Sequence, residues 1–250
     1  MIHVDHDDVY KTKYVWLWLL LSFKAGFLNA GGFLATGKFV SHITGFGTQV
    51  GIALGDTDYT FGIELLVIPI SFILGAAVTA MILEKEYARN EIPPYPYVQL
   101  LITLLIGLVA WAGSKGSFGK FFQHLNDYHT ITMIALLCFI CGLKNSLTTW
   151  ATQGKIRTTH ITGLATDLGL NLHKFFTSSK GRSRFREKRR INFVRLLSLF
   201  SFSGGSLIST LLFPRLEYEG FYIVFIISIF LTVVSFVHRQ KKLRHVWGLV

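Results

Sequence analysis

The chain has 250 residues, of which 51% are hydrophobic and only 16% are charged, and its formal net charge is +11. A soluble domain of this length would carry more charged residues. The composition therefore excludes an ordinary soluble domain. It predicts an all-α integral membrane protein, with a single polytopic domain over residues 1–250.

The chain opens on acidic residues, Asp5, Asp7 and Asp8, and no small-residue cleavage site follows the first apolar run. We therefore expect the first apolar segment to be retained as a helix. Six apolar stretches are long enough, at roughly 17–25 residues each, to cross a bilayer as helices. These predicted spans are Tyr14–Leu34, Phe61–Leu83, Tyr97–Ala112, Thr130–Ala151, Ile191–Phe213 and Phe221–Val237.

The tetrapeptide His-Ile-Thr-Gly occurs twice, at His42–Gly45 and at His160–Gly163, each time after a long apolar segment. The surroundings of the two copies also match. The matched residues are Gly26, Asn29, Gly37, Lys38, Thr48, Gly51 and Leu54 in the first copy and Gly142, Asn145, Gly154, Lys155, Thr166, Gly169 and Leu172 in the second. The doubled unit predicts an internal repeat, with repeat 1 over residues 14–113 and repeat 2 over residues 130–237.

Each repeat contains three predicted spans, so the second copy enters the membrane from the side opposite to the first. The halves are then inverted repeats, related by a pseudo-two-fold axis in the membrane plane. Gly75 and Gly205 support this pairing, because Phe72 and Phe202 precede them by three residues. Inverted repeats with interrupted segments at equivalent positions are typical of transporters, with a binding site near the midplane, and channels share this symmetry.

The positive charges predict the orientation of the chain. Eighteen of the 25 Lys and Arg residues fall on one side of a six-span arrangement with both termini inside, and four fall on the other side. Short loops rich in Lys and Arg stay in the cytoplasm, so we expect cytoplasmic N- and C-termini. The densest basic run, Lys180–Arg190, predicts contact with anionic lipid headgroups. A nucleic-acid partner is not expected, because no binding module accompanies the run.

The segments 37–55 and 154–172 are too apolar for ordinary loops and too short and glycine-rich for full crossings. Broken backbone at membrane depth survives only where protein buries it or where it lines a wet cavity. We therefore expect two half-spanning segments that enter from opposite sides and meet near the pseudo-two-fold axis. The amides that open the short helices suit an anion or a carboxylate. The hydroxyls expected to line the shared cavity are those of Ser41, Thr44, Thr48, Thr158, Thr159, Thr162 and Thr166. Close packing of helices is the alternative role for these Gly and Thr residues.

The remaining candidate substrate-binding residues are Lys24, Asn29, His42, Lys144, Asn145, His160 and Asp167. A lysine near the middle of a span is costly and by default marks a function or an ion pair, with Asp167 and Glu64 as candidate partners. Snorkelling to the headgroups is the alternative. His42 and His160 occupy equivalent positions, which allows a proton relay. A metal site is not expected, because it would need three or more ligands. Cys138 and Cys141 are interpreted as packed thiols.

Several of these motifs resemble the YoaK family of bacterial inner-membrane proteins of unknown function. The similar segments are Ala25–Ala30, Gly37–Gly45, Gly142–Ser146 and Thr158–Gly169. The resemblance implies a polytopic protein of the bacterial inner membrane and brings no established substrate. The family often has Asp, Asn and Gln where this chain has Asn29, Phe46 and Lys144. These departures shift the expected site towards positive charge and favour an anionic ligand over proton coupling.

Three functions follow from this reading. The first is a transporter or channel for a small anionic or zwitterionic solute, bound where the two broken segments meet. The second is a non-transporting scaffold or lipid-binding protein. The third, a membrane-embedded enzyme, is disfavoured because none of the strong catalytic motifs is present. No catalytic residue, metal or cofactor is therefore predicted, and whether the chain forms a homo-oligomer is left open.

Overall fold

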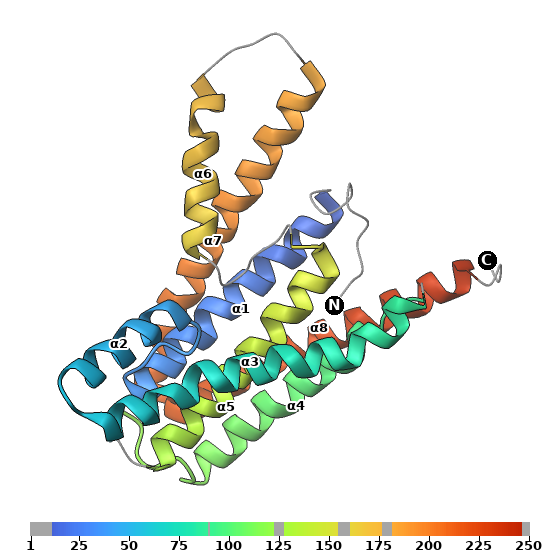
Figure 1. The fold of residues 1–250 in the computed structure, drawn as a ribbon. Coiled ribbons are helices and arrows are strands. Elements are labelled where there is room, and N and C mark those ends of the chain that lie inside the picture. Colours follow the sequence, from blue (N-terminus) through green and yellow to red (C-terminus); the bar gives the residue numbers. More distant parts are fainter. Residues whose placement is uncertain (1–11, 90, 123–127, 155–160, 177–181, 247–250) are drawn as a thin grey trace.

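The structure, a computed structural model, describes residues 12–89, 91–122, 128–154, 161–176 and 182–246 (Figure 1). These residues form helices joined by short connections, and no strand occurs among them. The helices are α1 (Thr12–Thr36), α2 (Ile43–Gly55), α3 (Tyr59–Ala88), α4 (Tyr95–Ser114), α5 (Tyr128–Thr152), α6 (Ile161–Phe176), α7 (Arg182–Leu216), the 3₁₀-helix η1 (Glu217–Glu219) and α8 (Gly220–Val246). The prediction of an all-helical protein is confirmed.

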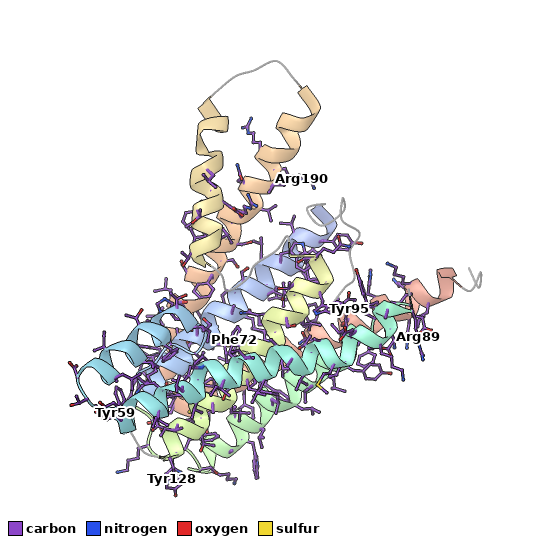
Figure 2. The ribbon with its side chains drawn as sticks, in the orientation of Figure 1. Tyr59, Phe72, Arg89, Tyr95, Tyr128 and Arg190 are labelled. Carbon is purple, nitrogen blue, oxygen red and sulfur yellow. The ribbon has the colours of Figure 1, made fainter. Side chains whose placement is uncertain are left out.

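Five stretches of the described chain are long and apolar enough to cross a membrane, and the last of them, Arg189–Leu243, covers most of α7, all of η1 and most of α8. Each predicted span lies inside one long helix: α1, α3, α4, α5, α7 or α8. The structure therefore has the features of a multi-pass membrane protein. Figure 2 places Tyr59 and Tyr128 at one end of the bundle and Arg89 and Tyr95 at the other.

Glycines end the two helices that precede the Gly-Thr-rich segments. Gly37 follows α1 with φ 71° and Gly154 follows α5 with φ 75°, a left-handed conformation that favours glycine and commonly terminates helices. The Gly37 amide donates to the Phe33 carbonyl at 2.7 Å, and the Gly154 amide donates to the Thr149 carbonyl at 2.9 Å. The chain then turns into the short helices α2 and α6, as expected for interrupted segments.

Two tight helix pairs form the centre of the molecule: α1 packs on α7, and α5 packs on α3. Each pair is built on Phe-x-x-Gly. A Cβ atom on Gly26 would collide with the Phe202 carbonyl, and one on Gly205 would collide with the Phe23 carbonyl. The same reciprocal relation joins Gly75 to the Phe139 carbonyl and Gly142 to the Phe72 carbonyl. Small residues of this kind let helix backbones approach closely in membranes.

Hydroxyl groups bridge the same two pairs at matching places. Thr79, four residues after Gly75, donates to the Leu143 carbonyl at 3.1 Å. Ser209, four residues after Gly205, donates to the Phe27 carbonyl at 2.9 Å. Each bond therefore joins the residue four positions after one glycine to the residue directly after its partner.

The other helices pack in matching pairs. Helix α1 contacts α8 as α5 contacts α4, while α2 lies on α3 as α6 lies on α7. Helices α4 and α8 pack on each other, with the Thr103 and Thr232 hydroxyls 2.8 Å apart. In Figure 1, α6 and the N-terminal part of α7 form a hairpin that stands away from the remaining helices.

Candidate functional site

Two lysines are buried where α1 crosses α5. The side chains of Lys24 on α1 and Lys144 on α5 belong to residues only 1% and 2% exposed. The Lys144 Nζ donates to the Leu21 carbonyl at 3.2 Å, and the Lys24 Nζ has no hydrogen-bond partner. Leu21 and Lys24 are three residues apart and share one face of α1, so the Lys144 ammonium lies within about one helical turn of Lys24. The structure therefore buries Lys24 between the helices and does not extend its side chain to the membrane surface.

Cys141 completes this cluster, which we call the lysine crossing (Leu21, Lys24, Cys141 and Lys144). Cys141 precedes Lys144 by one turn of α5 and interacts electrostatically with both lysines. Among the described side chains, the charged groups that act on the two lysines include no carboxylate. The lysine crossing therefore holds two buried lysines, one from each of two helices, on which no carboxylate acts among the described side chains.

The connection between α1 and α2 folds back over this region. Val40 is fully buried, and its carbonyl accepts a hydrogen bond from the Cys138 Sγ at 3.3 Å. Ser41 donates to the Asn29 side-chain oxygen at 2.9 Å. The structure thus brings together Asn29 and Ser41, which the sequence analysis proposed for one site. Asn145, the counterpart of Asn29, is also buried.

The other sequence-predicted residues of α2 and α6 lie away from the lysine crossing. His42 is exposed, with its ring edge against Phe39. The exposed threonines of the two motifs bond to their own helices: Thr48 donates to the Thr44 carbonyl at 3.3 Å, and Thr166 donates to the Thr162 carbonyl at 3.0 Å. These two equivalent bonds satisfy hydroxyls on helix surfaces.

Asp167 pairs with an arginine of α7. Its carboxylate lies 2.7 Å from the Arg195 guanidinium, and Arg195 also donates to the Asn192 side chain at 3.3 Å. The ion pair holds α6 against α7. The prediction that Asp167 pairs with Lys24 or Lys144 is therefore wrong. The side chain of Glu64, the other candidate partner, lies outside the described residues.

The expected meeting of the two broken segments is not seen in the described part of the chain. There α2 packs on α3 and α6 packs on α7, and the two short helices are not among the pairs in extensive contact. The physical reason is that each short helix buries its apolar residue, Phe46 or Leu164, inside its own hairpin. Thr158, Thr159 and His160 lie outside the described residues.

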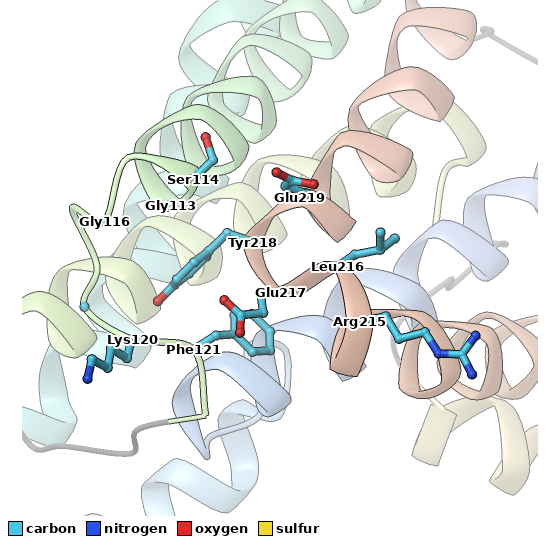
Figure 3. A pocket seen from close by; sticks show the side chains of 11 residues that line it. Gly113, Ser114, Gly116, Lys120, Phe121, Arg215, Leu216, Glu217, Tyr218 and Glu219 are labelled. Carbon is cyan, nitrogen blue, oxygen red and sulfur yellow. The ribbon is translucent and has the colours of Figure 1, made fainter.

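Two cavities lie at the ends of the bundle. One, of about 390 Å³, is lined by Tyr87, Thr149, Trp150, Gln153 and Gly154. The other, of about 620 Å³, lies between the loop after α4 and the α7–α8 turn. Figure 3 shows Lys120 reaching it from the loop, and Glu217 and Glu219 from the turn. Acidic and basic side chains both line this cavity, on a loop and a turn at the end of the bundle. Lys24 and Lys144 are instead buried between helices. The structure forms no cluster of three or more potential metal ligands among the described residues.

Two features of the helix interior were not predicted from the sequence. Cys141 was interpreted only as a packed thiol, although its three-residue spacing from Lys144 places both on one helix face. A polar seam between α4 and α8 was also overlooked: Thr103 donates to the Ser228 carbonyl at 3.2 Å, and Gln99 is buried beside it. Gln99, a polar residue inside the predicted apolar span Tyr97–Ala112, was the feature of the sequence that could have indicated these contacts.

These features define a polytopic α-helical membrane protein with two lysines buried between its helices. The chain belongs to the family described as Protein of unknown function (DUF1275), whose model matches residues 17–237. This membership is consistent with the resemblance to the YoaK family. No curated protein and no solved structure matches the chain.

Proposed function

We propose that this chain is a small membrane transporter or channel for an anionic or zwitterionic solute, bound at the lysine crossing. The observation that carries the proposal is the burial of Lys24 and Lys144 with no carboxylate acting on them among the described side chains. A buried charge left unpaired costs several kcal/mol, on the order of what a missing ion-pair partner costs. Ionisable residues inside membrane segments usually mark substrate or ion pathways.

The helix packing supports two inverted repeats. Exchanging α1 with α5, α2 with α6, α3 with α7 and α4 with α8 turns each packed helix pair described above into another such pair. The reciprocal glycine contacts and the Thr79 and Ser209 bonds obey the same exchange. The axis of this exchange passes between α1 and α5, so the lysine crossing occupies the position where inverted-repeat transporters hold their substrates.

The arrangement also supports six crossings with both termini in the cytoplasm. Tyr59 and Tyr128, which this orientation assigns to the outside, lie together at one end of the bundle. Arg89 and Tyr95, which it assigns to the cytoplasm, lie at the other end. The 390 Å³ cavity then opens on the cytoplasmic side. Thr149, in its wall, is five residues beyond Lys144, or about 7.5 Å along α5, which supports access from that side.

A lipid-binding role is supported by a different feature, the α6–α7 hairpin. It stands away from the other helices, and Arg189 and Arg190 on it are exposed. Each Lys or Arg near an anionic membrane surface contributes roughly 1 kcal/mol of attraction. We propose that the basic run binds anionic headgroups of the bacterial inner membrane while the helices carry out transport. Neither proposal requires catalysis, a cofactor or a nucleic-acid partner.

The test is solute uptake by phosphatidylcholine vesicles that contain the purified full-length chain. Radiolabelled sulfate, chloride, acetate and glycine are compared with rubidium, and protein-free vesicles give the background. We expect at least one anion or glycine to enter above background, and rubidium to stay at background. In the Lys24→Gln/Lys144→Gln variant the uptake should fall by about tenfold or more. Background uptake of every solute by folded protein would reject transport, as would rubidium entry equal to that of the anions.

A further inference from the structure

We infer that the lysine crossing takes a dianion: one small oxyanion with two negative charges, of the class of sulfate or hydrogen phosphate. This inference rests on the proposed function and narrows it, since an anionic or zwitterionic solute would satisfy that function equally. Charge is the first feature that favours a dianion. Two lysine side chains, one from each repeat, are buried at the same crossing, and the described side chains supply no carboxylate to either.

Lys24 and Lys144 do not occupy equivalent positions of the two repeats. Under the repeat register, in which Gly26 answers to Gly142, the counterpart of Lys24 is Ile140 and the counterpart of Lys144 is Leu28. The internal repeat therefore explains neither lysine. Each is a separate cation placed in an apolar setting, and both are directed at one helix crossing. The sequence thus concentrates two positive charges where the repeat alone would leave hydrophobic contacts.

The two lysines also have hydrogen-bond donors that the described residues do not use. A lysine ammonium has three donors and no acceptor. Lys144 uses one donor on the Leu21 carbonyl, and Lys24 has no hydrogen-bond partner among the described residues. Cys141, the third side chain of the cluster, is a weak donor as a thiol. The described site therefore has more donors than acceptors, and an oxyanion with several oxygens supplies the missing acceptors.

The same inventory disfavours a zwitterion. Its own ammonium would enter a site that already holds two, with no carboxylate among the described side chains to receive it. Like charges at this separation repel strongly in a low-dielectric interior. A single monoanion would neutralise only one of the two lysines. One dianion compensates both charges.

The test is binding to the full-length protein in detergent, measured with radiolabelled sulfate. Chloride and glycine serve as competitors at equal ionic strength. We expect sulfate to bind, and neither chloride nor glycine to compete with it at equal concentration. Lys24→Gln and Lys144→Gln should each weaken sulfate binding by about tenfold or more. Each should also turn the preference from sulfate towards chloride, because one cation remains. The matched control is Lys85→Gln, at an exposed lysine of α3, which should leave binding unchanged.

The outcomes separate this inference from the proposed function. If vesicles take up glycine or chloride but the protein does not bind sulfate, the proposed transport function stands and the inference of a dianion site is wrong. Sulfate binding that depends on both lysines, without uptake of any solute, would keep the dianion site and overturn transport. Unchanged sulfate binding in both single variants would overturn the assignment to the lysine crossing. Because these variants remove buried charges, we expect them to fold, and thermal melting checks this. The phosphate of phosphatidylcholine is a phosphodiester with one negative charge, so sulfate uptake in these vesicles excludes a lipid phosphomonoester as the required ligand.

Discussion

Gly26 of α1 and Gly205 of α7 are reciprocal: each lies against the carbonyl of the phenylalanine that precedes the other by three residues. At both positions the nearest atoms belong to the backbone of the other helix, which cannot move aside as a flexible side chain could. The α3–α5 pair repeats this relation at Gly75 and Gly142. The four glycines therefore set the distance between the helices that carry the lysines and their immediate neighbours.

Gly26→Ala should destabilise the protein. The added methyl group would collide with the Phe202 carbonyl and force α1 away from α7, with a loss of about 1–3 kcal/mol in the free energy of unfolding. Gly204→Ala is the matched control, since a Cβ there meets nothing within 4 Å. The control should be neutral or stabilising because Ala favours helix. Unfolding by SDS titration in mixed micelles measures both, and equal effects would contradict the close approach.

The hydroxyl pair between α4 and α8 should contribute modestly to stability. Thr103→Val removes its bond to Thr232, which spans 2.8 Å, at a loss of about 0.6 kcal/mol in the free energy of unfolding. The Thr103→Val/Thr232→Val variant should lose less than the sum of the single changes, because they share this bond. Thr132→Val is the control, since its exposed hydroxyl bonds only the Tyr128 carbonyl of its own helix. Strictly additive effects would argue against a direct bond.

Loss of the Asp167–Arg195 ion pair should loosen α6 from α7. Asp167→Asn removes the charge 2.7 Å from the Arg195 guanidinium, and both groups are partly exposed, so we expect a stability loss of about 1 kcal/mol or less. The sharper readout is access to Leu164, which is buried on α6. A cysteine at Leu164 should react faster with a polar maleimide in the Asp167→Asn background. A cysteine at the exposed Thr166 should react at the same rate in both backgrounds.

Sided labelling should reveal the orientation of the two short helices. With Cys138 and Cys141 replaced, single cysteines at the exposed positions Thr44 and Thr162 are treated with an impermeant maleimide in oriented vesicles. Inverted repeats require Thr44 to react from outside and Thr162 from the cytoplasmic side, because three crossings separate the equivalent positions. Reaction of both from the same side would contradict the inverted arrangement.

The long apolar helices could be predicted from the chain alone, although α7 begins before its predicted span and α8 continues beyond its own. Apolar length marked α1, α3, α4, α5, α7 and α8, because transfer out of water depends on composition and not on the neighbour. The glycines at 37 and 154 marked where α1 and α5 end, because the left-handed backbone there is a local property. The matched motifs likewise marked Asn29 and Ser41, which the structure joins by a hydrogen bond.

Which helix faces which was decided only by the tertiary structure. The apolar composition of a helix predicts that it lies in the membrane, but it does not predict which of the other apolar helices it packs against. The pairing of α1 with α7 depends on where two backbones can approach, and that depends on both helices at once. The same reason explains the missed partners. Asp167 had a nearby arginine available on α7, and the burial of Lys24 follows from the crossing of α1 and α5, which no local pattern encodes.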